Sequence, residues 1–199
     1  MPIETPWLPG SGIPYCIRGQ LCAEDVQALE WMYSHALEGT DTIEIGTAYG
    51  GSAFIGARRA KEQNCRHWCI DEFGRPGSLL PGEPSMEITF SSLWATGVHR
   101  WAVLVPGTSC EVGWRFTGAQ FGAAFIDGNH TAEWGRSDLL FCARVVRAGG
   151  FIAAHDLWEV SDRRYYADYS AAVAEFVAEA GWSEVFRAGG TAVWQTGAV

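Results

Sequence analysis

The sequence contains acidic and histidine residues that stand directly after short apolar segments. Asp71, Asp127 and the pair His155 and Asp156 each end such a segment, and His130 follows Asp127 by three positions. Carboxylates with a histidine nearby can hold a hard cation, move a proton or bind hydroxyl groups. Carboxylates placed beside apolar segments are costly to bury unless a ligand, a cation or hydrogen bonds compensate. These five residues are therefore the first candidates for a functional site.

A glycine-rich stretch, Gly46-Thr-Ala-Tyr-Gly-Gly-Ser52, follows the first of these apolar segments. Glycine lets a backbone approach a ligand closely, and amides at a helix N-terminus suit an anion. Asp71 ends the next segment, where an acidic residue is placed to accept hydrogen bonds from ribose hydroxyls. Together the two features predict a nucleoside cofactor, and the alternative is a tight turn with a solvated strand end. The glycine spacing matches neither the dinucleotide fingerprint G-x-G-x-x-G nor a phosphate loop, which needs a lysine before Ser52.

Strand and helix patterns alternate along the chain, which predicts an α/β fold with a mostly parallel sheet. Strands are expected at 41–45, 67–71, 101–105, 122–127, 151–155, 183–187 and 191–195. Helices are expected at 24–37, 52–64, 85–96, 110–118, 134–147 and 165–180. The interior strands are continuously apolar, as in sheets covered by helices on both faces. The last two strands have no helix between them and are expected to form an antiparallel hairpin. In such a sheet, ligands bind outside the carboxyl ends of the parallel strands.

Composition limits the class of protein. The 199 residues carry a net charge of −9 and are 48% hydrophobic, which suits one globular domain, expected at 23–199. Four of the eight prolines lie in the first 14 residues, so residues 1–22 are expected to form an arm or lid. The sequence shows neither a membrane-spanning run nor a secretory signal, so a cytoplasmic protein is expected. Net acidity disfavours binding to nucleic acid.

Six cysteines occur without a C-x-x-C spacing. Cys65, His67 and Cys69 alternate along one predicted strand and so share a face, which leaves a metal site open as an alternative. Buried free thiols in a reducing compartment are the preferred interpretation.

The motif Ile43-Glu-Ile-Gly-Thr-Ala-Tyr-Gly-Gly-Ser52 resembles motif I of class I S-adenosylmethionine-dependent methyltransferases. The resemblance continues through Cys69-Ile-Asp71, Phe125-Ile-Asp-Gly-Asn-His130 and Gly149-Gly-Phe-Ile-Ala-Ala-His-Asp156. This order is similar to that of small-molecule O-methyltransferases of the cephamycin- and macrolide-tailoring type, over roughly residues 40–160. The resemblance implies a Rossmann-like fold with a seven-stranded, mostly parallel sheet.

The resemblance also implies which residues contact S-adenosylmethionine. The glycine loop would cradle the methionine end, Asp71 would bind the ribose, and Gly107–Ser109 would flank the adenine. The family usually has an acidic residue where this sequence has Thr108. The implied cofactor-binding residues are Glu44, Gly46, Thr47, Ala48, Tyr49, Gly50, Ser52, Asp71, Thr108, Ser109 and Asp127.

For the reaction, the resemblance implies a divalent metal held by Asp127, His155 and Asp156. The two carboxylates fit a hard cation such as Mg²⁺, whereas His155, which replaces a carboxylate of the best-studied relatives, leaves room for a softer metal. A metal that coordinates the acceptor hydroxyl lowers its pKa, and His130, beside Asp127, stands where relatives have their catalytic base. Alternatively, His130 only positions Asp127.

We therefore expect methyl transfer to a hydroxyl of a small molecule. The alternatives are a metal-independent enzyme that uses the same cofactor and an inactive partner subunit that has kept the cofactor pocket. Because the segments that would cover the acceptor are short, the acceptor binds in an open cleft or a neighbouring subunit closes the site in a homo-oligomer.

Overall fold

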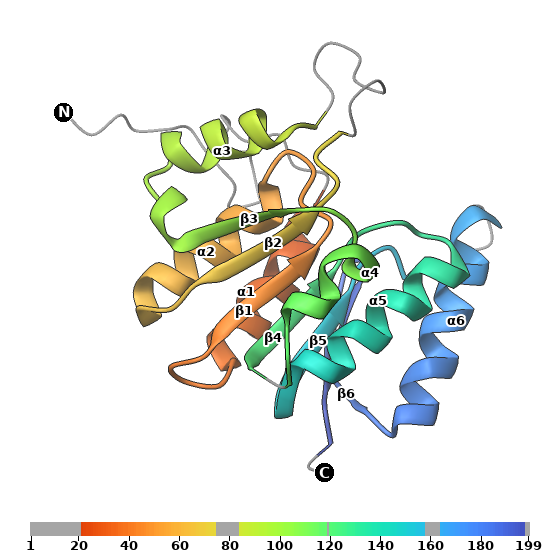
Figure 1. The fold of residues 1–199 in the computed structure, drawn as a ribbon. Coiled ribbons are helices and arrows are strands. Elements are labelled where there is room, and N and C mark those ends of the chain that lie inside the picture. Colours follow the sequence, from red (N-terminus) through yellow and green to blue (C-terminus); the bar gives the residue numbers. More distant parts are fainter. Residues whose placement is uncertain (1–20, 75–83, 119, 158–163, 198–199) are drawn as a thin grey trace.

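A central sheet of seven strands organises the computed structural model, which describes residues 21–74, 84–118, 120–157 and 164–197 (Figure 1). The strand order is β3-β2-β1-β4-β5-β7-β6. β1 to β5 run parallel, and β7 is antiparallel to both β5 and β6. The bounds are β1 Asp41–Ile45, β2 His67–Asp71, β3 Ala102–Pro106, β4 Phe121–Ile126, β5 Val146–Ala154, β6 Ser183–Ala188 and β7 Thr191–Gln195. The predicted Rossmann-like sheet with its C-terminal hairpin is thus confirmed.

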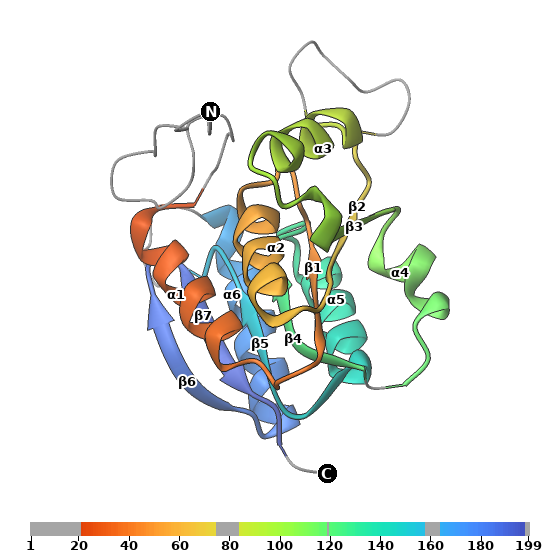
Figure 2. The same cartoon turned by 90° about the vertical axis from the view of Figure 1, so that its left-hand side faces the viewer.

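Helices cover both faces of the sheet (Figures 1 and 2). The first three helices pack on one face, and the last three pack on the other. Their bounds are α1 Ala23–His35, α2 Gly51–Gln63, α3 Met86–Ala95, α4 Ser109–Val112, α5 Ala132–Val145 and α6 Arg164–Ala180. No helix in the described part of the chain combines the length and apolarity needed to cross a membrane.

Alternation along the strands divides the core into two layers. In β4, Ala123 and Phe125 belong to the layer under α1 and α2, whereas Ala124 and Ile126 belong to the layer under α5 and α6. Successive side chains of a strand point to opposite faces, so a strand between two helical layers buries side chains on both faces. This explains the continuously apolar strands.

Most elements differ from the expected bounds by at most two residues, but β5 begins five residues before the strand expected at 151–155, and α4 is shorter than the helix expected at 110–118. The helix expected at 134–147 ends at Val145, because Val146 already pairs with Phe121 and begins β5. The helix expected at 110–118 is only the single turn α4, followed by the 3₁₀ turn Gly113–Arg115. Gly113 lies against α5, where an added Cβ would come within 3.0 Å of the Arg144 guanidinium.

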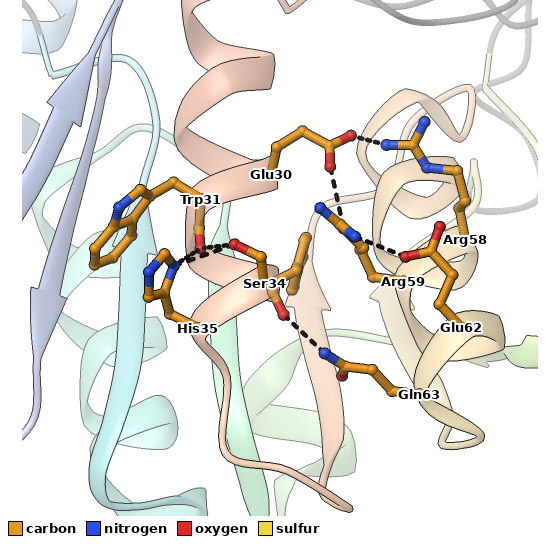
Figure 3. Close-up of polar contacts among 9 residues, drawn as sticks. Glu30, Trp31, Ser34, His35, Arg58, Arg59, Glu62 and Gln63 are labelled. Carbon is orange, nitrogen blue, oxygen red and sulfur yellow. Dashed lines mark hydrogen bonds and ion pairs between the residues drawn. The ribbon is translucent and has the colours of Figure 1, made fainter.

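Polar contacts hold α1 against α2 (Figure 3). Glu30 of α1 pairs with Arg58 and also with Arg59, whose Nε lies 3.2 Å from the carboxylate. Arg59 also pairs with Glu62 at 2.7 Å. Exposed pairs of this kind contribute little individually. They join the second half of α1 to α2.

Candidate active site

A cavity of about 740 Å³ lies at the carboxyl ends of the parallel strands. Most of the predicted site residues contribute to its wall, from the loops that follow β1, β2, β3, β4 and β5. Those that line it are Gly46, Thr47, Ala48, Tyr49, Ser52, Asp71, Thr108, Ser109, Asp127, His130 and Asp156. Glu44, Gly50 and His155 are not among the lining residues. Residues 1–20 of the expected arm lie outside the described residues, and Leu21, which follows them, lines the cavity.

The glycine loop is closed against the end of β4. Gly46 has a φ of +86°, and a side chain there would overlap the carbonyl of Asp127. Only glycine combines this backbone conformation with such a close approach. Its amide donates to the carbonyl of Ile70 at 2.9 Å, so the loop is held from β2 as well.

Asp71 fixes the same loop from the end of β2. Its Oδ2 accepts hydrogen bonds from the amides of Thr47 at 2.6 Å and Ala48 at 3.0 Å. Its Oδ1 accepts from the amide of Phe73 at 2.6 Å. A carboxylate has about four acceptor positions, so one is left for a ligand hydroxyl. Asp71 thus shapes the loop in addition to the ribose contact expected for it.

At the ends of β4 and β5, three side chains converge on the cavity. Nε2 of His130 lies 3.3 Å from Oδ1 of Asp127 and 3.5 Å from Oδ2 of Asp156. The His130 ring is held edge-on by Tyr166 and Tyr169, at centroid distances of 5.2 and 5.1 Å. Burial opposes ionisation of Asp127, but hydrogen bonds to the two neighbouring histidines keep the pKa of Asp127 below its ordinary value. The arrangement can accept a proton or hold a hard cation.

His155 lies behind Asp127 and is held through both ring nitrogens. Nδ1 is 3.0 Å from Oδ1 of Asp127, and Nε2 is 3.2 Å from Oδ2 of Asp25. Burial would lower the pKa of His155, but the hydrogen bonds to Asp127 and Asp25 outweigh it and raise the pKa to about 10. A protonated imidazole has no lone pair for a metal. As a metal ligand, His155 would have to lose its proton and release one of the two carboxylates.

Asp25 was not recognised from the sequence as part of the site. It lies in the first turn of α1, is 2% exposed, and accepts from the Gly190 amide at 2.8 Å and the Thr191 hydroxyl at 3.0 Å. Burial opposes its ionisation, yet hydrogen bonds from His155 and Cys22 keep the pKa of Asp25 below its ordinary value. Apart from Cys22, its partners lie far away in the sequence, so no local pattern pointed to its place in the site.

Asp138 of α5 was also missed. It is 3% exposed, lines the cavity, and accepts a hydrogen bond at Oδ1 from the hydroxyl of Ser109. Burial, which outweighs the bond from Ser109, raises the pKa of Asp138 to about 6. The sequence did contain a signal for Asp138, because it lies on the same helix face as the buried Leu139 and Cys142, where a charged residue is unusual.

Glu44 lies on the face of β1 that packs under α1 and α2, away from the cavity. It is completely buried, with Oε2 3.3 Å from Nε2 of His67. Its position does not support the expected cofactor contact. His67 and Cys69 share this face with Glu44, whereas Cys65 is not part of the cluster. Cys65 and Cys69 are buried free thiols, as expected.

Comparisons with known proteins agree with this geometry. A family model described as a methyltransferase domain matches residues 43–157. The O-methyltransferase TomG from Streptomyces achromogenes, solved with S-adenosylmethionine, is 15% identical, with a TM-score of 0.63 over 87% of this chain and 81% of that chain. The O-methyltransferase from Bacillus cereus, solved with S-adenosylhomocysteine, is 12% identical, with a TM-score of 0.63 over 94% and 85%.

A third similar structure is the methyltransferase PaMTH1 from Podospora anserina, bound to S-adenosylhomocysteine. It is 16% identical, with a TM-score of 0.60 over 87% of this chain and 79% of that chain. At these identities the structures establish a shared fold. No curated protein sequence matches the chain.

Proposed function

Since this chain belongs to the methyltransferase domain family, we propose that it transfers the methyl group of S-adenosylmethionine to a hydroxyl of a small molecule, assisted by a divalent metal. The observation that carries the proposal is that two groups of residues with different chemistry line one cavity. The glycine loop and Asp71 form one part, and Asp127, His130 and Asp156 form the other. The first suits a nucleoside with an anionic end, and the second suits proton removal beside it.

The chain's own residues account for cofactor binding and alignment. Asp71 takes the amides of Thr47 and Ala48, so the amides that suit the carboxylate of the cofactor's methionine end are those of Gly51 and Ser52 in the first turn of α2. Asp71 has an acceptor position left for a ribose hydroxyl. When bound, S-adenosylmethionine supplies a sulfonium methyl group, which the acceptor oxygen attacks in line while the carbon–sulfur electron pair goes to sulfur. Alignment of the two reactants contributes much of the rate.

His130 is the group placed to accept the proton of the acceptor hydroxyl, at Nε2. It lines the cavity, and the rings of Tyr166 and Tyr169 fix its orientation. The proton moves from the acceptor oxygen to the imidazole as the oxygen–methyl bond forms. His155 positions Asp127 from behind, and Asp25 in turn holds His155.

Asp127 and Asp156 are the residues that would hold the metal. Both carboxylates line the cavity, and their oxygens lie within 4.8 Å of each other and of Nε2 of His130. Oxygen donors of this kind fit Mg²⁺, and the bound cation would lower the pKa of the acceptor hydroxyl.

One observation favours a second candidate, a metal-independent enzyme with the same cofactor. The imidazolium of His155 lies 3.0 Å from Asp127 and so supplies positive charge at the cluster from within the chain. For either candidate we propose a cytoplasmic enzyme whose acceptor site is an open cleft or is closed by a second copy of the chain.

The test is calorimetric titration with S-adenosylhomocysteine, first with Mg²⁺ and then with EDTA, followed by turnover assays on small hydroxyl compounds. We expect micromolar binding under both conditions and turnover that EDTA abolishes. Turnover that survives EDTA supports the metal-independent enzyme. Binding without turnover on any acceptor supports an inactive partner subunit, and absence of binding refutes the proposal. In the turnover assay, His130→Ala is expected to lose activity while keeping its affinity for S-adenosylhomocysteine.

A further inference from the structure

A second cluster of polar side chains lies inside the core, between the sheet and the helices α1 and α2 (Figure 2). Glu44, His67 and Cys69 are each completely buried, and none of them lines the cavity. One ligand atom from each residue lies within 4.8 Å of those of the other two. A carboxylate and an imidazole are costly to bury unless a partner replaces the lost water. The proposed methyl transfer uses none of these three groups, so their burial needs another explanation.

The register of β1 and β2 brings the three side chains together. Glu44 of β1 pairs with Cys69 of β2, and two positions earlier Thr42 pairs with His67. Residues two apart in a strand point to the same face, so these side chains share the face under α1 and α2. The helix leaves room for the imidazole, because a Cβ at Gly56 of α2 would come within 2.4 Å of the His67 ring. Strand pairing and a helix glycine thus build a closed site.

Hydrogen bonds among the described residues do not satisfy this cluster. Neither carboxylate oxygen of Glu44 has a hydrogen-bond partner there, nor has Nε2 of His67, although Oε2 and Nε2 lie 3.3 Å apart. Nδ1 of His67, by contrast, lies 2.8 Å from the hydroxyl oxygen of Thr42. When Nδ1 donates its proton to Thr42, Nε2 carries a lone pair. That lone pair and the Glu44 carboxylate repel each other unless a cation lies between them.

The three types of donor indicate which cation fits. A thiolate, an imidazole and a carboxylate together suit zinc, whereas a sulfur donor does not suit Mg²⁺. Two ligands that each lie about 2.0–2.1 Å from a tetrahedral zinc ion are about 3.3 Å apart, which matches the distance from Oε2 of Glu44 to Nε2 of His67. The thiolate of Cys69 and the carboxylate of Glu44 balance the charge of a divalent ion, so the loaded site is neutral.

Tyr33 of α1 offers an oxygen for the fourth position of a tetrahedral ion. It is completely buried, and its ring lies edge-on to that of His67 at a centroid distance of 5.4 Å. Its hydroxyl has no hydrogen-bond partner in the part of the chain that the structure describes. Burial and the negative charges of Glu44 and Cys69 raise the pKa of Tyr33, so the hydroxyl lies within reach of their field. A cation held by those two residues would give this oxygen the partner it lacks.

We propose that Glu44, His67 and Cys69 bind a structural zinc ion between the sheet and the helices α1 and α2. Cys69 releases its thiol proton to solvent when the ion binds, and Thr42 is the positioning residue that orients His67. The ion ties β1 to β2 two residues before the glycine loop begins. The inference does not rest on the proposed function, because this site is separate from the cavity and from the metal proposed there.

The first test measures the zinc content of the purified protein by mass spectrometry. Protein from zinc-supplemented cells is passed over a chelating resin, which removes loosely bound ions. We expect about one zinc ion per chain in wild type and in Cys65→Ala, and less than about a fifth of that in Cys69→Ala. Cys65→Ala is the matched control, because Cys65 is also a buried thiol but is not part of the cluster.

Cobalt distinguishes this site from the cavity. Protein produced in minimal medium in which Co²⁺ replaces Zn²⁺ is expected to show a thiolate-to-cobalt charge-transfer band in the near ultraviolet. The candidate metal ligands at the cavity are carboxylates and histidines, so an ion held by them does not give this band. We expect the band in wild type and in Cys65→Ala, and its absence in Cys69→Ala.

Thr42→Val tests the positioning role, because it keeps the branched shape of the side chain and removes the acceptor for Nδ1 of His67. Loss of a hydrogen bond that orients a metal-bound histidine costs roughly 10- to 100-fold in metal affinity. We expect this loss in Thr42→Val, measured by competition with a fluorescent zinc chelator, and wild-type affinity in Thr42→Ser. Equal zinc affinities in the two variants would mean that Thr42 only packs.

Two results would overturn the inference. If wild-type protein carries no zinc and shows no cobalt band, the cluster is a buried ion pair of Glu44 and His67. If Cys69→Ala keeps the zinc ion, the metal lies elsewhere in the chain. Should Cys69→Ala fail to fold, as judged by circular dichroism, Glu44→Gln takes its place, since it keeps the size of the side chain and is expected to lower the zinc content in the same way.

Discussion

Replacing Asp138 with asparagine is expected to stabilise the protein at neutral pH. The pKa of Asp138 is about 6 in the folded chain, against an ordinary value of 3.8, because the carboxyl group is buried. Each pKa unit corresponds to about 1.4 kcal/mol, so ionised Asp138 lowers the free energy of unfolding by about 3 kcal/mol. Asparagine never ionises and can still accept the hydrogen bond from Ser109, so it removes this cost.

The sign of the pH dependence follows from the raised pKa. The stability that protonated Asp138 contributes to the folded chain is fully present below pH 3.8 and is lost as the pH rises through about 6. The advantage of Asp138→Asn over wild type is therefore about 3 kcal/mol at pH 7.5 and less than about 1 kcal/mol near pH 4. For a chain of this length, 1 kcal/mol corresponds to about 2–4 °C in melting temperature.

Urea unfolding followed by circular dichroism at both pH values measures this difference. Asp168→Asn is the control, since Asp168 is an exposed residue of α6 and the same substitution there leaves the unfolding free energy unchanged. An equal effect of Asp138→Asn at both pH values, or a loss of stability at pH 7.5, would refute the reasoning. Either result would mean that the carboxylate of Asp138 is stabilised in the folded chain.

Three further predictions concern other parts of the fold. Gly46→Ala is expected to weaken binding of S-adenosylhomocysteine at least tenfold, because the added methyl group overlaps the carbonyl of Asp127. Gly39→Ala is the control, because Gly39 also has a positive φ but an added methyl group there meets open space. Equal affinities in the two variants would contradict the prediction. The stability that His155 contributes is fully present below pH 6.5 and is lost as the pH rises through about 10, so the urea midpoint of wild type should fall over this range. An equally steep fall in His155→Gln would show that another group is responsible. Glu30→Ala, which removes the ion pairs of Figure 3, is expected to cost less than about 1 kcal/mol, and less still at high salt; a loss insensitive to salt would point to packing instead.

The sequence allowed the strands and most of the cavity wall to be predicted for one physical reason. Carboxyl ends of neighbouring parallel strands meet at one edge of a sheet, so residues that directly follow strands must converge. Asp71, Asp127 and Asp156 obey this rule, and each lines the cavity. The hydrophobic pattern of the strands was sufficient to place them, without knowledge of how the helices pack.

Residues that reach the site from helices could not be predicted in this way. Asp25 and Asp138 lie on α1 and α5, and their roles depend on packing between elements far apart in the sequence. Glu44 is the opposite case, because a motif predicted it to contact the cofactor while strand alternation turns its side chain away from the cavity and toward His67. Its neighbours in the motif, Gly46 and Thr47, have left the strand and do line the cavity.

The hydrogen bonds of Asp25 have a consequence for biosynthesis. This carboxylate joins the first turn of α1, His155 and the turn between β6 and β7, where it accepts from Gly190 and Thr191. Chains emerge from the ribosome N-terminal end first, and pairing between distant segments must wait for the later one. A nascent chain that has reached Asp156, just after β5, already contains every residue proposed for catalysis but lacks the hairpin that holds Asp25 in place. Assembly of the site is therefore a late event, completed only when the last two strands have joined the sheet.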